Sequence, residues 1–270
     1  MNINIDKADE KEIRTHLLPY AQDIIIETTD EIDSTNDELK NRALKGQQEI
    51  TLLIAEHQTK GKGSKGRSFF SPDGTGCYMS FLIRPAYPAE ECTLLTTMAS
   101  AVTAQAIETV TGKTAQIKWV NDIYIERRKV AGILTQAGFA KDGKSLDYAI
   151  VGIGINITEP KGGFPGEIKN IAAAISSEGT KIKNRLIGEI VNRFIYYYKN
   201  LTAKEYMSDY RDRLFFLGEE ITVIESDKIY TAIAKDVDNL CHLIIETENG
   251  ESKALFGGEI SIKTAKNPTE

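Results

Sequence analysis

Four cations and three glycines fall within one short stretch without acidic residues, Gln58-Thr59-Lys60-Gly61-Lys62-Gly63-Ser64-Lys65-Gly66-Arg67. The whole chain has a formal net charge of -6, so this excess of positive charge is local. Glycines let a backbone approach a ligand closely, and successive N–H groups beside cations bind phosphate oxygens. The stretch predicts an anion-binding loop for a nucleotide; a lysine-rich surface loop is the alternative.

This loop is not a Walker A motif. Gly63 stands where Ser or Thr would coordinate Mg²⁺, and Glu56 stands where the first glycine would be. The sequence therefore argues against a P-loop NTPase.

A second cluster combines Lys118 and the sole tryptophan with the polar pair that follows them in Lys118-Trp119-Val120-Asn121-Asp122. An Asx-bonded turn between two strands would explain Asn121 and Asp122. Lys118, however, is flanked by Ile117 and Trp119 and could reach a phosphate. Downstream, Lys129 enters an apolar strand in which a glycine at 132 would let a ligand or backbone pass closely.

Gly152-Ile153-Gly154-Ile155-Asn156 has a GxG core without the GxGxxG continuation or a following helix, so it is a weak dinucleotide signal. Two glycines inside a strand indicate that something needs space there, either a neighbouring strand or a ligand. The three histidines are too scattered to form a metal or nucleophile site. The residues thus predict phosphate handling by positioned lysines, with no nucleophile.

Alternating strands and helices must position these clusters. The strands that we expect are Ile24–Glu27, Thr51–Ala55, Cys77–Ile83, Gln116–Val120, Ile123–Glu126, Val130–Phe139 and Tyr148–Ile157. The helices that we expect are Lys7–Tyr20, a helix from Ser34 or Thr35 to Gly46, Thr93–Val110, a helix near Ile171–Ser176, Lys183–Lys199 and Ala203–Arg213. This pattern predicts a mixed α/β domain over residues 24–216, after a linker-like segment over residues 1–23.

The character of the chain changes from Glu220 onwards to short alternating strands. We expect them at Ile221–Ile224, Tyr230–Asp236, His242–Glu246 and Lys253–Phe256. Asn249-Gly250 predicts a type I′ hairpin between the last two. Residues 217–270 therefore predict a small β-barrel of the SH3 type.

Composition narrows the class of protein. Three cysteines in a chain of 270 residues, with no CxxC pair, argue against a disulfide framework and a zinc site. The first residues lack the apolar core of a signal peptide, and no apolar run is long enough to span a membrane. The acidic net charge disfavours a general nucleic-acid binder. We expect a soluble, cytoplasmic protein.

Taken in order, the motifs resemble those of the biotin–protein ligase family. Asp33-Ser34-Thr35-Asn36 resembles its STN signature, and the glycine loop with Ser71-Pro72 resembles its Gln…GRGRRGR loop. Lys118–Asp122 and Arg128–Leu134 resemble KWPND and RKLAGIL. Gly152–Asn156 and Gly257-Gly258-Glu259-Ile260-Ser261 complete the series. The match runs from residue 24 to the C-terminus.

The resemblance implies a mixed-sheet, class II synthetase-like catalytic domain of the biotin/lipoate ligase type, followed by an SH3-like barrel. It implies that ATP and biotin form biotinyl-5′-AMP, and that biotin then passes to a lysine of a biotin carboxyl carrier domain. Attack of a carboxylate on the α-phosphate concentrates negative charge, so catalysis should rest on positioning and cations, with Mg²⁺ on the polyphosphate. No enzyme nucleophile is then required.

The resemblance also implies roles for single residues. The expected catalytic residues are Lys129, Lys62 and Asp122, with Asp122 also near the metal and the incoming amine. Biotin is expected to contact Ser34, Thr35, Asn36, Gln58, Gly61, Lys62 and Gly132. The nucleotide is expected to contact Lys60, Gly63, Ser64, Lys65, Phe69, Lys118, Asn121, Asn156 and Lys263.

The sequence departs from the family pattern at three positions. Ser64 replaces an arginine of the loop, Phe69 replaces tryptophan, and Val120 replaces proline. Because one cation is missing, we expect looser retention of the adenylate, although Lys65 could substitute for the lost charge.

Two alternative functions are weighed against that of a biotin–protein ligase, and expectations on DNA binding and on dimerisation follow. A lipoate ligase or octanoyltransferase shares the fold, but its Arg-x-x-Gly-Gly-Gly segment and downstream histidine are missing. A non-catalytic nucleotide- or biotin-binding regulator has less need of Lys129. Residues 1–23 are too short for the winged helix of bifunctional relatives, so we expect a ligase-only form without specific DNA binding. A homodimer through the strands Val130–Phe139 and Tyr148–Ile157 stays open.

Overall fold

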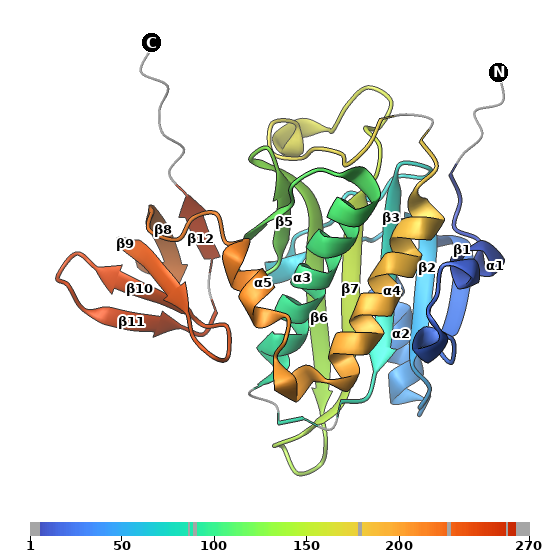
Figure 1. Ribbon diagram of the computed structural model, residues 1–270, viewed down its shortest axis with the longest axis horizontal. Helices are drawn as coiled ribbons and strands as arrows, with labels where there is room; N and C mark the ends of the chain where they lie inside the picture. The colour runs from blue at the N-terminus through green and yellow to red at the C-terminus, as the bar shows by residue number, and fades with distance from the viewer. Residues whose placement is uncertain are drawn as a thin grey trace.

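Two β-sheets organise the chain in the computed structural model, which describes residues 6–85, 87–88, 91–177, 180–225, 228–257 and 259–262. A seven-stranded sheet carries helices on both faces, and a five-stranded sheet lies beside it near the C-terminus (Figure 1). The predicted mixed α/β fold with a small C-terminal β-module is confirmed.

The larger sheet has the strand order β1-β2-β3-β7-β6-β5-β4. Only β1 and β2 pair in parallel, and the other neighbours are antiparallel. The strands are β1 Ile25–Ile32, β2 Thr51–Gln58, β3 Gly76–Ile83, β4 Gln116–Lys118, β5 Asp122–Ile125, β6 Arg128–Phe139 and β7 Leu146–Asn156.

The two faces of this sheet differ. Helices α3 (Cys92–Thr111) and α4 (Lys183–Lys199) cover one face with most of the core, and α5 (Met207–Asp212) packs on α3 (Figure 1). Helix α2 (Thr35–Leu44) lies on the opposite face over a small cluster that includes Leu39, Leu53 and Ile150. Since strand side chains alternate between faces, the residues of β7 at 152 and 154 also face α2.

The N-terminal segment is fixed to the first turns of α4. Asp6 accepts hydrogen bonds from the backbone N–H groups of residues 182 and 183, and the N–H of Ala8 donates to Glu56. Glu56 also pairs with Lys183 at 2.6 Å, and both side chains are buried. Helix α1 (Glu10–Thr15) follows this attachment.

The smaller sheet has the order β11-β10-β9-β8-β12 and is antiparallel throughout. Its strands are β8 Glu220–Glu225, β9 Lys228–Val237, β10 Leu243–Thr247, β11 Ser252–Leu255 and β12 Glu259–Ile262. The indole N–H of Trp119 donates to the carbonyl of Cys241 at 2.9 Å. The sole tryptophan therefore joins the second cluster of the sequence to this module.

Two helix predictions were wrong or too long. The segment near Ile171–Ser176 is not helical, because its backbone bonds to strands instead: Ala173 N–H donates to the carbonyl of Lys129, and Ile175 N–H to that of Asn156. The helix expected over Lys7–Tyr20 is restricted to α1, with a 3₁₀ turn at Pro19–Ala21.

Further boundaries were also misplaced. The helix expected from Ala203 begins only at Met207, after a left-handed residue at Lys204. The strand expected to reach Val120 ends at Lys118, and the turn after it contains a cis Trp119–Val120 peptide.

The type I′ hairpin was assigned to the wrong place. At Asn249-Gly250 only the glycine has a positive φ, and the Thr247 N–H pairs with the Glu251 carbonyl around a three-residue loop. The two positive φ values of a type I′ turn occur at Glu126 and Arg127, between β5 and β6.

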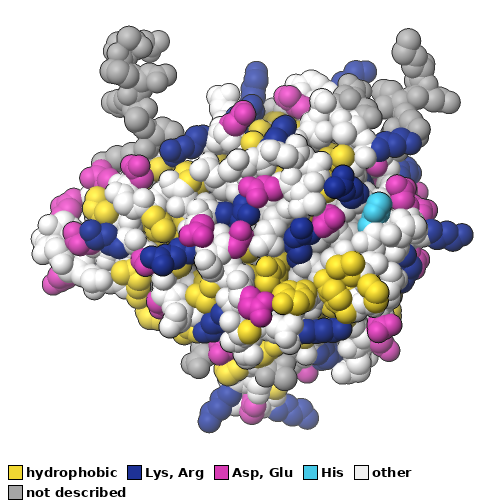
Figure 2. Space-filling view, viewed as in Figure 1, with side chains coloured by type: hydrophobic (Ala, Val, Ile, Leu, Met, Phe, Trp, Pro, Cys, Tyr) yellow, Lys and Arg dark blue, Asp and Glu magenta, His cyan; other side chains and the backbone are white. Residues whose placement is uncertain are grey.

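Figure 2 shows positive and negative side chains interspersed over the visible face. Among the described residues, no helix is both long and apolar enough to cross a membrane.

Candidate active site

A cavity opens between the start of α2, the glycine loop and strands β3, β6 and β7. Seven residues expected in the site line it: Ser34, Thr35, Asn36, Gln58, Lys62, Phe69 and Gly132. The remaining lining residues are Met79, Leu134, Gly152, Ile153 and Gly154. Residues far apart in the sequence are thus brought to one hollow on the α2 face of the sheet.

The N-terminus of α2 forms one wall of this cavity. Ser34 is the N-cap, with extended backbone, and its hydroxyl accepts a hydrogen bond from the N–H of Asp37. The next two residues, Thr35 and Asn36, lie in the first turn and are buried. The helix start therefore presents short polar side chains to the cavity.

Gln58 holds this helix start against the end of β2. Its Oε1 accepts from the backbone N–H of Thr35 at 2.9 Å and lies 3.1 Å from the Thr35 hydroxyl. Its Nε2 then donates to the hydroxyl of Ser71 at 3.2 Å, and Ser71 donates to the carbonyl of Phe69. The orientation of the Gln58 amide is therefore fixed on both sides.

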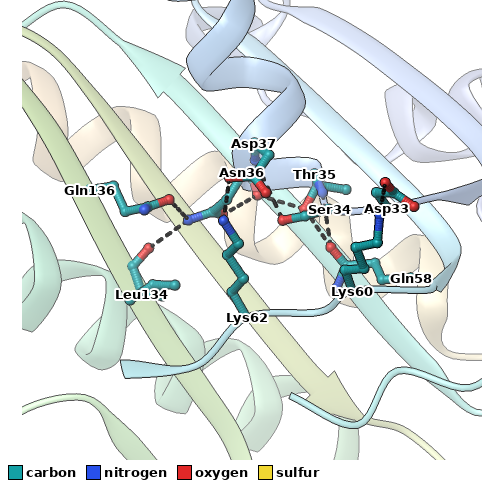
Figure 3. Close-up of polar contacts among 11 residues, drawn as sticks. Asp33, Ser34, Thr35, Asn36, Asp37, Gln58, Lys60, Lys62, Leu134 and Gln136 are labelled. Atoms are coloured by element: carbon teal, nitrogen blue, oxygen red, sulfur yellow. Dashed lines mark hydrogen bonds and ion pairs between the residues drawn. The ribbon is translucent and has the colours of Figure 1, made fainter. Parts of the chain in front are cut away.

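Asn36 continues the polar contacts across the cavity floor (Figure 3). Its Nδ2 donates to Gln136 Oε1 at 3.0 Å and to the carbonyl of Leu134 at 3.3 Å. Its Oδ1 accepts from the hydroxyl of Ser80 at 2.6 Å. The Asn36 side chain of α2 is therefore hydrogen-bonded to both β3 and β6.

The two glycines of β7 leave space for side chains. A Cβ on Gly152 would lie 2.2 Å from Asn36 Oδ1, and a Cβ on Gly154 would lie 2.7 Å from the Phe69 ring. The GxG segment therefore accommodates neighbouring side chains that line the cavity, and nothing in it requires a dinucleotide.

The glycine loop returns on itself as a narrow turn. Lys62 and Ser68 form an antiparallel bridge, and the N–H of Gly63 donates to the Arg67 carbonyl at 2.7 Å. At Gly61 a Cβ would lie 2.5 Å from the Phe69 carbonyl oxygen, so the close approach requires glycine there. Lys65 adopts a left-handed conformation with φ of 55°.

Each cation of the loop contacts a carboxylate. Lys60 lies 2.8 Å from Asp33 and Lys62 lies 2.6 Å from Asp37, both acids being at the start of α2 (Figure 3). Hydrogen bonds from Lys60 and from a neighbouring threonine lower the pKa of Asp33. The loop is thus held on the helix that forms the opposite wall.

The tip of the loop contacts the smaller sheet. Arg67 lies 3.0 Å and Lys65 3.7 Å from Glu259 of β12. Partial burial opposes ionisation of Glu259, but the hydrogen bond and charge of Arg67 outweigh it and lower its pKa. Loop and C-terminal module are therefore electrostatically linked.

A lysine–aspartate pair lies beside Gly132, which lines the cavity, although neither member of the pair lines it itself. Lys129 Nζ is 2.6 Å from Asp122 Oδ1, and a Cβ on Gly132 would be 3.3 Å from the same ammonium group. Gly132 thus keeps open the space beside Lys129. Lys118 is nearby, and burial lowers the pKa of its ammonium group, while Asp122 opposes that shift.

Two of the residues predicted to contact the nucleotide, Asn121 and Asn156, bond to backbone carbonyls of the protein. Asn121 does not make an Asx turn: its Nδ2 donates to the Ile133 carbonyl on β6. Asn156 Nδ2 donates to the Ala173 carbonyl at 3.0 Å. Both amides therefore fix backbone segments, and contact with a nucleotide stays a prediction. Lys263 lies outside the described residues.

Sequence reasoning did not assign to the site the acids that pair with the loop cations, nor two polar residues beneath the cavity, Ser80 and Gln136. Ser80 carried a detectable signal, because it is the polar residue inside the apolar run Cys77–Ile83 and is fully buried. Its partners lie at 36 and 136, and no sequence spacing links such distant positions.

No group of three His, Cys, Asp or Glu side chains in the described part of the chain could enclose a metal ion.

Known protein families match most of this architecture. Residues 29–156 match the family model of the Biotin/lipoate A/B protein ligase family, the class that the fold and the cavity define. Residues 216–263 match the Biotin protein ligase C terminal domain. The chain belongs to the biotin protein ligase family.

Curated relatives include the bifunctional ligase/repressor BirA of Bacillus subtilis, 36% identical over 177 residues, covering 65% of this chain and 54% of the relative. The chain thus spans about half the length of this relative. The biotin--[acetyl-CoA-carboxylase] ligase of Mycobacterium tuberculosis is 25% identical, covering 93% of this chain and 94% of the relative.

Among solved structures, the biotin protein ligase from Aquifex aeolicus in complex with biotin and ATP has a TM-score of 0.72 and 27% identity. The match covers 89% of this chain and 99% of that one.

Proposed function

We propose that this protein is a biotin–protein ligase that uses ATP to form biotinyl-5′-AMP and transfers biotin to a lysine of a biotin carboxyl carrier domain. The observation that carries the proposal is a cavity lined by uncharged polar side chains, with a lysine–aspartate pair beside Gly132, one of its lining residues. The polar side chains gather beneath α2, and the pair is Lys129 with Asp122.

The uncharged polar side chains suit a ureido ring. Thr35, Asn36 and Gln58 offer hydroxyl and amide groups with fixed hydrogen-bond directions. A site built from oriented polar groups rejects ligands that leave those groups unpaired. The alkyl chain of octanoate and the dithiolane ring of lipoate would do so, which favours biotin over the alternative substrates of this fold.

The charged side chains suit the reacting groups. In the first step the biotin carboxylate attacks the α-phosphorus of ATP, and pyrophosphate leaves. Lys129 and Lys62 would exchange Asp122 and Asp37 for carboxylate and phosphate oxygens, and so stabilise the charge that develops. In the second step an amine of the carrier attacks the acyl carbonyl, and AMP leaves.

The remaining assignments extend this arrangement. We propose that biotin also contacts Ser34 and Gly61, with Gly132 beside its tail. The nucleotide would be bound from among Lys60, Gly63, Ser64, Lys65, Phe69, Lys118, Asn121, Asn156 and Lys263. Mg²⁺ usually takes one or two carboxylates together with substrate phosphates, and Asp122 would supply such a carboxylate.

A homodimer is compatible with the sheet. Strand β6 runs from Arg128 to Phe139, but β5 pairs with it only as far as Gly132. Within the described residues, the second half of β6 therefore has β7 on one side and no strand on the other. A second copy could pair with this edge.

Transfer to a carrier tests the proposal. The protein is incubated with biotin, ATP, Mg²⁺ and a biotin carboxyl carrier domain, and intact-mass spectrometry follows biotinylation of the carrier. We expect one biotin added per carrier domain, and strong loss of transfer in Lys129→Ala. An unmodified carrier, together with modification of a lipoyl domain in the presence of lipoate, would overturn the assignment.

A further inference from the structure

Four side chains form a continuous hydrogen-bonded line beneath the cavity: Thr35, Ser80, Asn36 and Gln136. Thr35, Ser80 and Asn36 are almost completely buried, with exposed fractions of 3%, 0% and 5%. Buried polar groups must find partners within the protein. Since each side chain has a fixed set of donors and acceptors, the direction of every bond can be worked out.

The donor and acceptor of each bond can be assigned in turn, beginning with the bond between Asn36 and Gln136. Asn36 faces two oxygens, Gln136 Oε1 and the Leu134 carbonyl, so its NH₂ group must point toward them. Its Oδ1 therefore faces Ser80 and accepts the proton of that hydroxyl at 2.6 Å. Ser80 then has no proton left for Thr35, so the single proton of the Thr35 hydroxyl goes to Ser80 at 2.7 Å rather than to Gln58 Oε1, the longer contact at 3.1 Å.

The consequence appears at the cavity wall. With its proton directed to Ser80, the Thr35 hydroxyl keeps its lone pairs free and can accept an N–H from a ligand. We propose that Gln136 is a positioning residue that sets the direction of this line, and so makes Thr35 an acceptor for a ring N–H of the bound substrate. The inference deepens the proposed function and rests on it, because the ureido ring of biotin carries such N–H groups.

Gln136 holds the stronger part of this control. Its bond to Asn36 is shorter than that of the Leu134 carbonyl, 3.0 Å against 3.3 Å. Without an acceptor at 136, the Asn36 amide can turn over, so that its NH₂ donates to Ser80. Ser80 would then donate to Thr35, and Thr35 to Gln58 Oε1, 3.1 Å away. The two bonds that join Asn36, Ser80 and Thr35 would be reversed, and Thr35 would lose acceptor capacity.

Two matched variants test the role of the acceptor. Gln136→Glu keeps an acceptor of the same length, and Gln136→Met keeps the length without an acceptor. Biotin-dependent exchange of labelled pyrophosphate into ATP gives the two KM values. We expect Gln136→Met to raise the KM for biotin about tenfold, the loss expected for one well-placed hydrogen bond, and to leave the KM for ATP within about twofold. Gln136→Glu should resemble the unsubstituted protein.

A double substitution separates this role from general support of the fold. Ser80→Ala breaks the line in its middle, so adding Gln136→Met to it should raise the KM for biotin little further. Fully additive effects, or equal changes in the KM for biotin and for ATP, would overturn the proposal.

The ligand-free protein provides a readout that does not depend on the substrate. Buried hydroxyl protons exchange slowly enough for NMR, and the resonance of the Thr35 hydroxyl should move in Gln136→Met but not in Gln136→Glu. An unmoved resonance in both variants would refute the line. If the unsubstituted chain showed no biotin-dependent exchange, the proposed function would fail, while this NMR comparison would still decide the role of Gln136.

Discussion

Adding one methyl group at Gly152 should damage both the fold and the cavity. The new Cβ of Gly152→Ala would lie 2.2 Å from Asn36 Oδ1, far inside van der Waals contact. Asn36 is buried and its amide is bonded at both ends, so it cannot move without breaking those bonds. The strand position itself is ordinary, because Gly152 does not have a positive φ.

The size of the effect follows from two contributions. Overpacking a close-packed interior costs about 1–3 kcal/mol. Displacing Asn36 also weakens its bonds to Ser80 and Gln136, which contribute about 1 kcal/mol each. We therefore expect Gly152→Ala to lower the free energy of unfolding by about 3 kcal/mol. The affinity for biotin should fall at least about tenfold, since Thr35 depends on the same line of bonds.

Urea unfolding followed by far-UV circular dichroism measures the first effect, and calorimetric titration with biotin the second. A second variant sharpens the test. Asn36→Ala in the Gly152→Ala background removes the clash, but it also removes the amide that bonds to Ser80 and Gln136. It should recover only the stability that was lost to overpacking, and none of the affinity. Unchanged stability and biotin affinity in Gly152→Ala would refute the reasoning.

Three other outcomes are expected. Ser64→Arg should slow the release of biotinyl-AMP, because it restores a loop cation typical of the family; equal release rates would contradict this. Lys183→Met should lower the free energy of unfolding by about 3–5 kcal/mol, because it leaves Glu56 buried without its partner, and adding Glu56→Gln should recover part of the loss. The KM for ATP should rise with pH through the lowered pKa of Lys118, because only the ammonium form attracts phosphate. In Lys118→Arg the KM should stay level over the same pH range.

Local patterns predicted most of the larger sheet and the helices that cover it. Apolar runs such as Cys77–Ile83 were long enough to define strands, and the stripe within Thr93–Val110 defined α3. The segment near Ile171–Ser176 failed because its alanines favour helix, whereas its backbone N–H and C=O groups find partners on β6 and β7. Tertiary contacts therefore overrode the intrinsic helix propensity of this segment.

The sequence predicted several residues that line the cavity, but not the hydrogen bonds and ion pairs between their side chains. The family resemblance assigned Thr35, Gln58 and Lys62 to one site, and these three residues line the same cavity. The pairing of Lys62 with Asp37, and of Asn36 with Gln136, depends on the register between α2 and the strands beneath it. Such contacts join residues whose spacing in sequence carries no periodic signal.

Biotin-dependent exchange of labelled pyrophosphate into ATP tests the central claim most directly, since it requires the cavity to bind biotin and ATP together and to form the adenylate. We expect exchange with biotin, little with lipoate or octanoate, and loss of exchange in Lys129→Ala. Exchange that required lipoate and ignored biotin would contradict the account.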